Sequence, residues 1–154
     1  MKTYTDNKQG YKIDLPDDWE LNVNNTPIIA NLLFRLTYGG PLKNGMEFIH
    51  GPNETLNFSI ESIPSIVTPE IIQLTFMEYA QREGYSSVKF GRIFVNGKVH
   101  PWVRYQMAPN VWSKKYMIIL NNVGYAITAS FQGNELVAQT ESEWDTIVSS
   151  LQLI

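Results

Sequence analysis

The chain has 154 residues, no cysteine and a formal net charge of -3 at pH 7. The lack of cysteine excludes disulfides, thiolate metal sites and cysteine nucleophiles, and the acidic balance argues against a nucleic-acid partner, because phosphate backbones are bound by basic surfaces. With 44% hydrophobic and 18% charged residues and no linker or repeat, residues 1–154 are expected to form a single domain.

Four short strands are predicted in the first part of the chain, where apolar residues alternate with polar ones. They cover residues 11–15, 19–23, 46–49 and 56–60. Between the second and third strands, Thr26-Pro27 is typical of a helix start. The apolar residues of 28–36 then fit one helical face, although the same run also fits a buried strand.

A more regular helix is predicted after Thr68, because Pro69 and Glu70 are typical of a first helical turn and Gly84 of a helix end. Its buried stripe is expected to consist of residues that recur at helical spacing, namely Ile71, Ile72, Phe76, Tyr79 and Ala80.

The second half of the chain is predicted to form an antiparallel meander. Asn96-Gly97 lies between alternating runs at 88–95 and 98–107, and this dipeptide accepts the positive φ angles of a type I′ hairpin turn. Two further turns separate strands at 111–120 and 125–131.

The last predicted element is a helix that begins near Glu141. Thr140-Glu141-Ser142-Glu143 is typical of a capping box, and apolar residues then recur at helical spacing as far as Leu151. We therefore expect Trp144, Ile147 and Val148 to pack on the sheet.

Taken in this order, the elements resemble the PsbP/Mog1-like domain family, which includes small bacterial proteins. The resemblance rests on residues 11–16 with Trp19, on the Asn96-Gly97 hairpin, and on residues 124–131 and 144–151. It implies an α+β fold in which helices cover an antiparallel β-sheet meander, an α/β/α sandwich. Proteins of this type include a photosystem accessory subunit, a binder of a nuclear-transport GTPase, bacterial lipoproteins and chaperones for secreted toxins, so the fold alone selects no function.

No catalytic motif is present, so we expect no enzyme, no cofactor and no metal site. The histidines His50 and His100 are far apart in the sequence, and a hydrolase that uses His100 is the least favoured alternative. His50 with Glu47 and Glu54 offers nitrogen and oxygen ligands, but such loops are usually just solvated. Two acidic groups have simpler roles, helix capping for Glu141 with Glu143 and turn formation for Asp17 with Asp18 and Glu20.

One strand carries the best candidate for a binding site. His100, Trp102 and Arg104 share a face of the predicted strand 98–107, opposite the more apolar face that carries Val103. Because Trp and Arg are enriched at interface hot spots, these three residues are predicted to bind a protein. The alternative is that a helix covers this face of the sheet and that the Trp102 ring is part of the core.

The sequence therefore predicts a non-catalytic accessory module that binds a protein or peptide. The alternatives are a protein that binds a small ligand or a metal in a pocket between sheet and helix, and a secretion chaperone for apolar helices. No apolar leader and no long apolar span occur, so a cytoplasmic location without a membrane span is expected, or an extracytoplasmic one if Met1 replaces a removed leader.

Overall fold

The computed structural model describes residues 1–22, 46–62 and 68–154. Within these residues most strands belong to one large antiparallel sheet, composed of β3 (Glu20–Leu21), β4 (Glu47–His50), β5 (Glu54–Ser62), β6 (Ser86–Val95), β7 (Lys98–Ala108), β8 (Val111–Leu120) and β9 (Val123–Gln132). A smaller sheet contains β1 (Lys2–Asp6), β2 (Tyr11–Leu15) and β10 (Gln152–Leu153). The predicted element over residues 28–36 lies outside the described residues.

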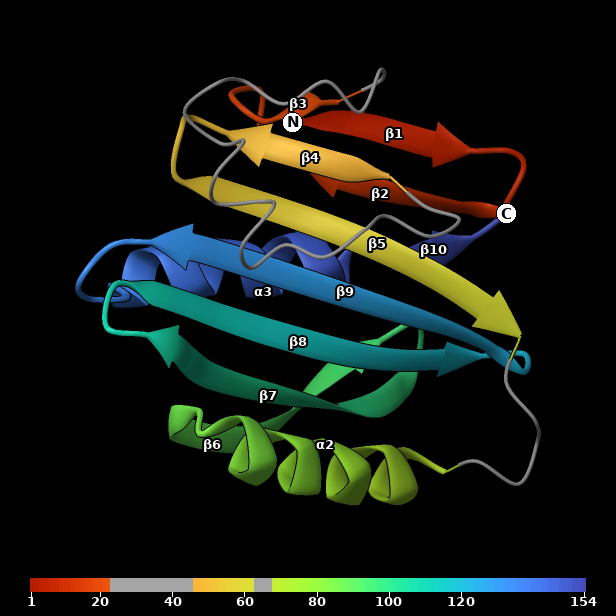
Figure 1. Cartoon of the computed structure of the whole chain (residues 1–154). Helices are drawn as coiled ribbons and strands as arrows, with labels where there is room; N and C mark the ends of the chain where they lie inside the picture. Colours follow the sequence, from red (N-terminus) through yellow and green to blue (C-terminus); the bar gives the residue numbers. More distant parts are fainter. Residues whose placement is uncertain (23–45, 63–67) are drawn as a thin grey trace.

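The large sheet has the strand order β3-β4-β5-β9-β8-β7-β6 and lies between two helices, α2 (Pro69–Glu83) and α3 (Ala138–Ser149). Figure 1 shows α2 on the near side of this sheet and α3 on the far side. The smaller sheet packs on the same side as α3, and together they bury the main hydrophobic core, which includes Tyr11, Tyr116 and Trp144. This arrangement is the α+β sandwich that the sequence predicts.

The predicted meander is present, because β6, β7, β8 and β9 pair with one another in chain order. At its first turn Asn96 and Gly97 have φ angles of 51° and 79°, as a type I′ turn requires. Val95 then lies opposite Lys98, so the turn dipeptide sets the register of the whole hairpin.

Helix α2 begins and ends where the sequence predicts. The Thr68 side chain accepts a hydrogen bond from the Ile71 backbone N–H at 3.3 Å, and Gly84 ends the helix in the left-handed region with a φ of 73°. These are the usual ways in which the unpaired backbone groups at helix ends are satisfied.

The buried stripe of α2 is narrower than predicted. Phe76 and Ala80 are buried against Tyr105 and its neighbours, but Ile71 and Tyr79 are 49% and 40% exposed. The prediction of burial is wrong for these two residues because α2 packs mainly on β7 and β8, near one edge of the sheet. A helix that packs near the edge of a sheet has few neighbouring elements, so the side chains on either side of its buried stripe stay exposed.

Helix α3 begins earlier than predicted and without the capping box. Its first residue is Ala138, and the preceding Val137 provides no side-chain cap. The packing face is as predicted, since Trp144, Ile147 and Val148 are fully buried.

Of the smaller sheet the sequence predicts β2, over residues 11–15, but neither β1 nor β10. Strand β1 pairs with β2 along five residues, and β10 adds only two. Trp19 follows β2 and is fully buried, although the strand predicted around it is only the two-residue β3.

Candidate functional site

The structure places His100, Trp102 and Arg104 on the face of β7 that lies under α3. His100 is 2% exposed and donates a hydrogen bond to the Val95 carbonyl oxygen at 3.2 Å. Burial lowers the pKa of His100. The expectation that His100 lies on an open binding surface is therefore wrong, because its side chain is buried on the α3 side of the sheet.

Trp102 is half-buried and packs against the neighbouring strand. It lies directly opposite Gly91, where a Cβ atom would come within 2.2 Å of the indole ring. Its Nε1 donates to the Arg92 carbonyl oxygen at 3.1 Å, and the Lys114 ammonium lies 3.9 Å from the ring centroid. The ring thus has packing partners on both sides, as core residues do.

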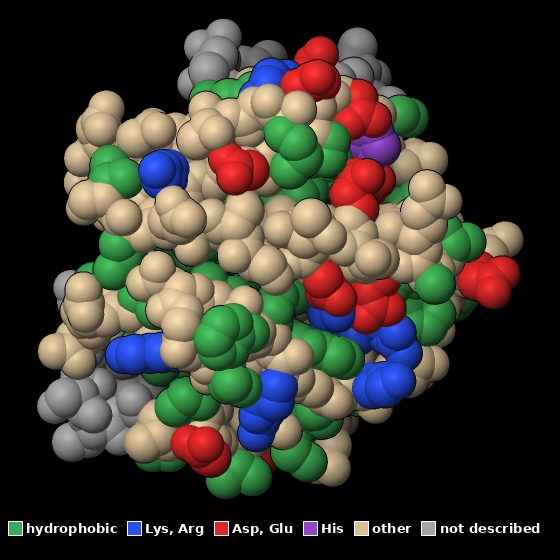
Figure 2. Space-filling model, turned by 180° about the vertical axis from the view of Figure 1, so that it is seen from behind, with side chains coloured by type: hydrophobic (Ala, Val, Ile, Leu, Met, Phe, Trp, Pro, Cys, Tyr) green, Lys and Arg blue, Asp and Glu red, His purple; other side chains and the backbone are tan. Residues whose placement is uncertain are grey.

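Arg104 belongs to an ion-pair network that joins α3 to the sheet. Arg104 Nη1 and Lys114 Nζ bind the two carboxylate oxygens of Glu141 at 2.6 and 2.7 Å, and Lys114 Nζ also binds Asp145 at 2.8 Å. Burial alone would raise the pKa of Glu141, but the hydrogen bonds from Lys114 and Arg104 outweigh it and the pKa is lowered. Figure 2 shows basic and acidic side chains side by side on the α3 face of the molecule. A binding role for Trp102 and Arg104 stays a prediction.

The outer side of α2 offers a more open surface. Ile71, Leu74 and Met77 follow one another at three-residue spacing and are 49%, 60% and 37% exposed. Residues three apart on a helix are neighbours, so these side chains form one apolar row. The exposed acidic residues Glu70 and Glu78 lie beside this row, which we call the α2 outer row (Ile71, Leu74 and Met77).

A second apolar feature lies on the same side of the large sheet. Phe94 and Val99 are cross-strand partners next to the hairpin turn and are 64% and 57% exposed. Phe94 is four residues after Phe90, which packs in the small core under α2, so both share the α2 face of β6. The described part of the chain thus has its large exposed apolar side chains concentrated on the α2 side.

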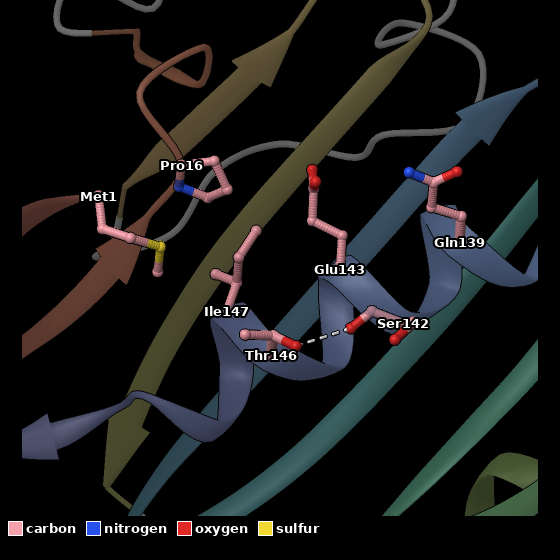
Figure 3. A pocket seen from close by; sticks show the side chains of 7 residues that line it. All are labelled: Met1, Pro16, Gln139, Ser142, Glu143, Thr146 and Ile147. Carbon is pink, nitrogen blue, oxygen red and sulfur yellow. Dashed lines mark hydrogen bonds between the residues drawn. The ribbon is translucent and has the colours of Figure 1, made fainter.

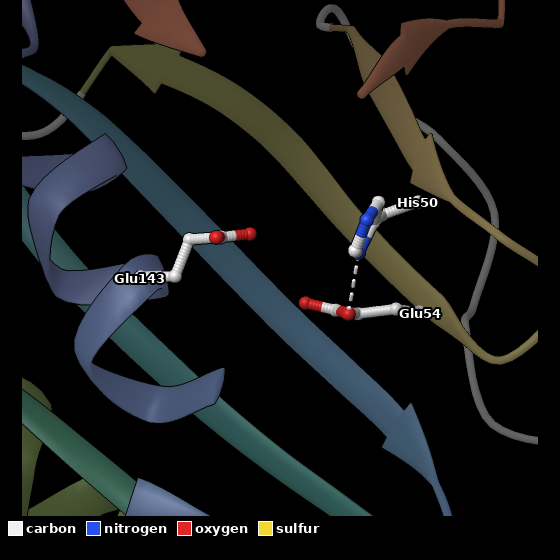
Figure 4. A group of neighbouring side chains, drawn as sticks. All are labelled: His50, Glu54 and Glu143. Carbon is white, nitrogen blue, oxygen red and sulfur yellow. Dashed lines mark hydrogen bonds and ion pairs between the residues drawn. The ribbon is translucent and has the colours of Figure 1, made fainter. Parts of the chain in front are cut away.

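A polar cluster occupies the other side, where β4, β5 and α3 meet. Figure 4 shows His50, Glu54 and Glu143 pointing toward one another, and Figure 2 shows histidine atoms beside acidic side chains on this face. His50 Nδ1 lies 2.9 Å from Glu54 Oε1, and Nε2 lies 2.7 Å from Asp18 Oδ2. Burial alone would lower the pKa of His50, but the hydrogen bonds to the two carboxylates outweigh it and the pKa is raised.

Two tryptophans hold the carboxylates of this cluster in place. Trp144 Nε1 donates to Glu54 Oε2 at 2.6 Å, and Trp19 Nε1 donates to Glu143 Oε1 at 2.7 Å. The Trp19 ring also stacks on His50, with 5.1 Å between centroids. Glu54 is 7% exposed, and burial raises its pKa.

Sequence reasoning found part of this cluster and missed the rest. His50 and Glu54 were expected to lie in one loop with Glu47, and they do pair across the β4–β5 turn. Glu47, however, is 1% exposed and accepts a hydrogen bond from the Asn22 side chain at 3.1 Å. In the structure Glu143, and not Glu47, completes the cluster. No local sequence pattern connects Glu143 with His50, because the two residues are far apart in the chain and only the tertiary fold brings them together.

A shallow pocket adjoins the cluster (Figure 3). It has a volume of about 290 Å³ and is lined by Met1 and Pro16 on one side and by α3 on the other, with Glu143 among the α3 residues. Ligand pockets usually have volumes of about 300 to 1,000 Å³, so this one is at the small end.

Among the described residues, neither helix is long or apolar enough to cross a membrane. No family profile and no curated protein sequence matches the chain.

Solved structures do match nearly its whole length. The solution structure of cyanobacterial PsbP (CyanoP) from Synechocystis sp. PCC 6803 has a TM-score of 0.64 and 16% identity, covering 99% of this chain and 92% of that chain. The crystal structure of the Ran-binding protein Mog1p from Saccharomyces cerevisiae has a TM-score of 0.60 and 11% identity, covering 99% and 94%. A mutant of Mog1 gives a TM-score of 0.58 and 10% identity, covering 94% and 90%. The resemblance deduced from the sequence is thus confirmed at the level of fold.

Proposed function

We propose that this chain, whose fold is PsbP/Mog1-like, is a non-catalytic accessory module that binds a protein partner through the α2 outer row. The observation that carries the proposal is the exposure of Ile71, Leu74 and Met77 on a helix whose other side already packs on the sheet. Apolar side chains gathered on a surface usually mark an interaction site. The structurally similar Mog1p also has a protein partner, since it is a Ran-binding protein.

The charges beside the row define the partner further. Glu70 and Glu78 are exposed beside the row, and Arg82 is the one basic residue of α2, near the end of the helix. An amphipathic helix with an apolar face and flanking lysine or arginine complements this surface in both polarity and charge. This partner chemistry also agrees with the sequence-based alternative of a chaperone for apolar helices.

A small-ligand function has weaker support. The pocket beside α3 has a volume of about 290 Å³ and opens next to Met1 and Pro16, and its size is below that of most ligand sites. The binding of a protein or peptide therefore remains the favoured function. The expected cytoplasmic location stays a prediction, which fractionation of cells that make the chain would test.

The first experiment places a photo-crosslinking amino acid at position 74 in cells that make the chain. The matched control places it at position 83, which is also exposed on α2 but lies half a turn around the helix, because nine residues correspond to about 900°. A partner cross-linked at position 74 and not at position 83, and rich in amphipathic basic helix, supports the proposal. Equal cross-linking at both positions contradicts it.

The second experiment measures the affinity of that purified partner for variants of the chain. Ile71→Gln with Leu74→Gln removes the apolar surface and keeps good helix formers, so the fold is expected to be unaffected. We expect the double variant to bind at least about tenfold more weakly, since hot-spot residues contribute more than about 1 kcal/mol each. Unchanged affinity of the folded variant would remove the α2 outer row as the site.

A further inference from the structure

We propose that His50, Glu54 and Glu143 form a binding site for a divalent transition-metal ion of the zinc type. The proposal departs from the expectation of no metal site, and it is independent of the protein-binding function proposed for α2. The three residues come from β4, β5 and α3, and one ligand atom from each lies within 4.8 Å of the others.

The donor set fits such an ion. Zinc binds imidazole nitrogen and carboxylate oxygen at about 2.0 to 2.2 Å, which places the ligand atoms of a tetrahedral site about 3.3 to 3.6 Å apart. His50 Nδ1 and Glu54 Oε1 are already 2.9 Å apart, and the Glu143 side chain needs to approach by roughly 1 Å to complete the set. Calcium and magnesium prefer sites made entirely of oxygen, so the histidine favours a transition metal.

The surroundings of the cluster orient the carboxylates as a second coordination shell does. Trp144 binds Oε2 of Glu54 and Trp19 binds Oε1 of Glu143, so each carboxylate keeps its other oxygen for the cluster. Hydrogen bonds that fix ligands in this way are a regular feature of metal sites. The Trp19 ring, stacked on His50, fixes the imidazole as well.

The charge of the cluster is a further reason to expect a metal ion there. Asp18, Glu54 and Glu143 carry three formal negative charges, and among the described residues His50 is the one basic side chain that pairs with them, through Asp18 and Glu54. Glu54 is moreover 7% exposed. Buried carboxylates are costly unless they are paired or coordinate a metal. A divalent ion would neutralise two of these charges.

The cluster is also accessible. Glu143 lines the pocket between α3 and the start of the chain (Figure 3), and the His50 side chain is 32% exposed. Asp18 Oδ2 lies 2.7 Å from His50 Nε2 and can accept the proton of that nitrogen, which leaves Nδ1 free to bind the ion. Three protein ligands would leave one position of a tetrahedral site for water.

The direct test is calorimetric titration of the purified chain, stripped with EDTA and dialysed, with zinc chloride. We expect one zinc ion per chain and an affinity that falls at least about tenfold in Glu143→Gln, whose amide oxygen still accepts from Trp19. Glu135→Gln is the matched control, because it removes the same charge from an exposed position before α3. Absence of saturable binding up to about 100 µM zinc, or equal affinity of the parent and Glu143→Gln, would overturn the proposal.

A second measurement needs no variant. Zinc is expected to shift the NMR signals of the His50 ring and to leave those of His100, which is buried and bonded to Val95. The two histidines thus serve as site and internal control within one sample. Shifts of neither ring, or of both equally, would show that the cluster holds no metal.

Discussion

Removal of the Trp144 side chain provides the sharpest test of how α3 is held on the sheet. The indole is fully buried, and its N–H donates to Glu54 Oε2 at 2.6 Å. Truncation of such a ring to alanine usually costs about 3 to 5 kcal/mol, and a buried acceptor left without its partner costs about 1 to 3 kcal/mol of stability. Part of the second cost disappears if water enters the cavity. We therefore expect Trp144→Ala to lower the free energy of unfolding by about 4 kcal/mol or more.

The two contributions are separated by a second substitution. Trp144→Phe retains most of the ring and removes the N–H donor, so its expected cost is about 1 to 3 kcal/mol. Trp112→Ala is the control, because that indole is half-buried and its N–H lies 3.4 Å from the Asn134 carbonyl oxygen, a weak hydrogen bond.

Urea unfolding followed by far-ultraviolet circular dichroism measures these effects. With a urea dependence of about 2 kcal/mol per molar, Trp144→Ala shifts the midpoint down by about 2 M. An unchanged midpoint in Trp144→Ala, or an equal shift in Trp112→Ala, would refute the packing described for α3.

Three further substitutions test the α3 network and the β6–β7 hairpin. Lys114→Ala is expected to lower the free energy of unfolding by about 3 kcal/mol, because it removes the buried ammonium that joins Glu141 to Asp145 and leaves Glu141 with Arg104 alone, and Lys114→Met is expected to cost less in the same urea titration. The lowered pKa of Glu141 contributes stability that is fully present above its ordinary value of 4.5 and is lost as the pH falls through the lowered pKa. We therefore expect the parent to be more stable than Glu141→Gln at neutral pH, and this stability difference to shrink below about pH 4.5. A stability difference that grows on acidification would contradict this sign. Gly91→Ala places a Cβ against Trp102 and is expected to cost about 1 to 3 kcal/mol in thermal unfolding, whereas no loss would mean that the ring does not pack there.

Elements with local signals were predicted well. Thr68 and Gly84 mark the two ends of α2, and Asn96-Gly97 marks the hairpin, because each signal acts through the backbone of its own neighbours. The α3 start was misplaced for the opposite reason. Glu141 belongs to the predicted capping box, but in the structure it binds Arg104 and Lys114 on the sheet.

The two strands that the sequence did not predict, β1 and β10, are formed by pairing with a strand that is distant in the sequence or has a stronger pattern. Strand β1 has a single aromatic residue, Tyr4, between polar neighbours, and the two-residue β10 exists because it pairs with β2. Both are stabilised by partners rather than by their own pattern.

The candidate sites show the same limit. Alternation correctly put Trp102 and Arg104 on one face of β7, but only the tertiary structure shows that α3 lies over that face. Helical spacing likewise selected Ile71 for the core, whereas α2 lies at the sheet edge and leaves it exposed. Periodicity identifies faces of an element, and it does not identify what covers them.

The central claim is that the chain binds its partner through the α2 outer row and not through the strand that carries Trp102. The most direct measurement is the affinity of the purified, cross-linked partner for the parent, for Ile71→Gln with Leu74→Gln, and for Trp102→Ala. We expect at least about tenfold weaker binding for the α2 variant and nearly parental binding for folded Trp102→Ala. Loss of binding in Trp102→Ala with full binding by the α2 variant would contradict the claim.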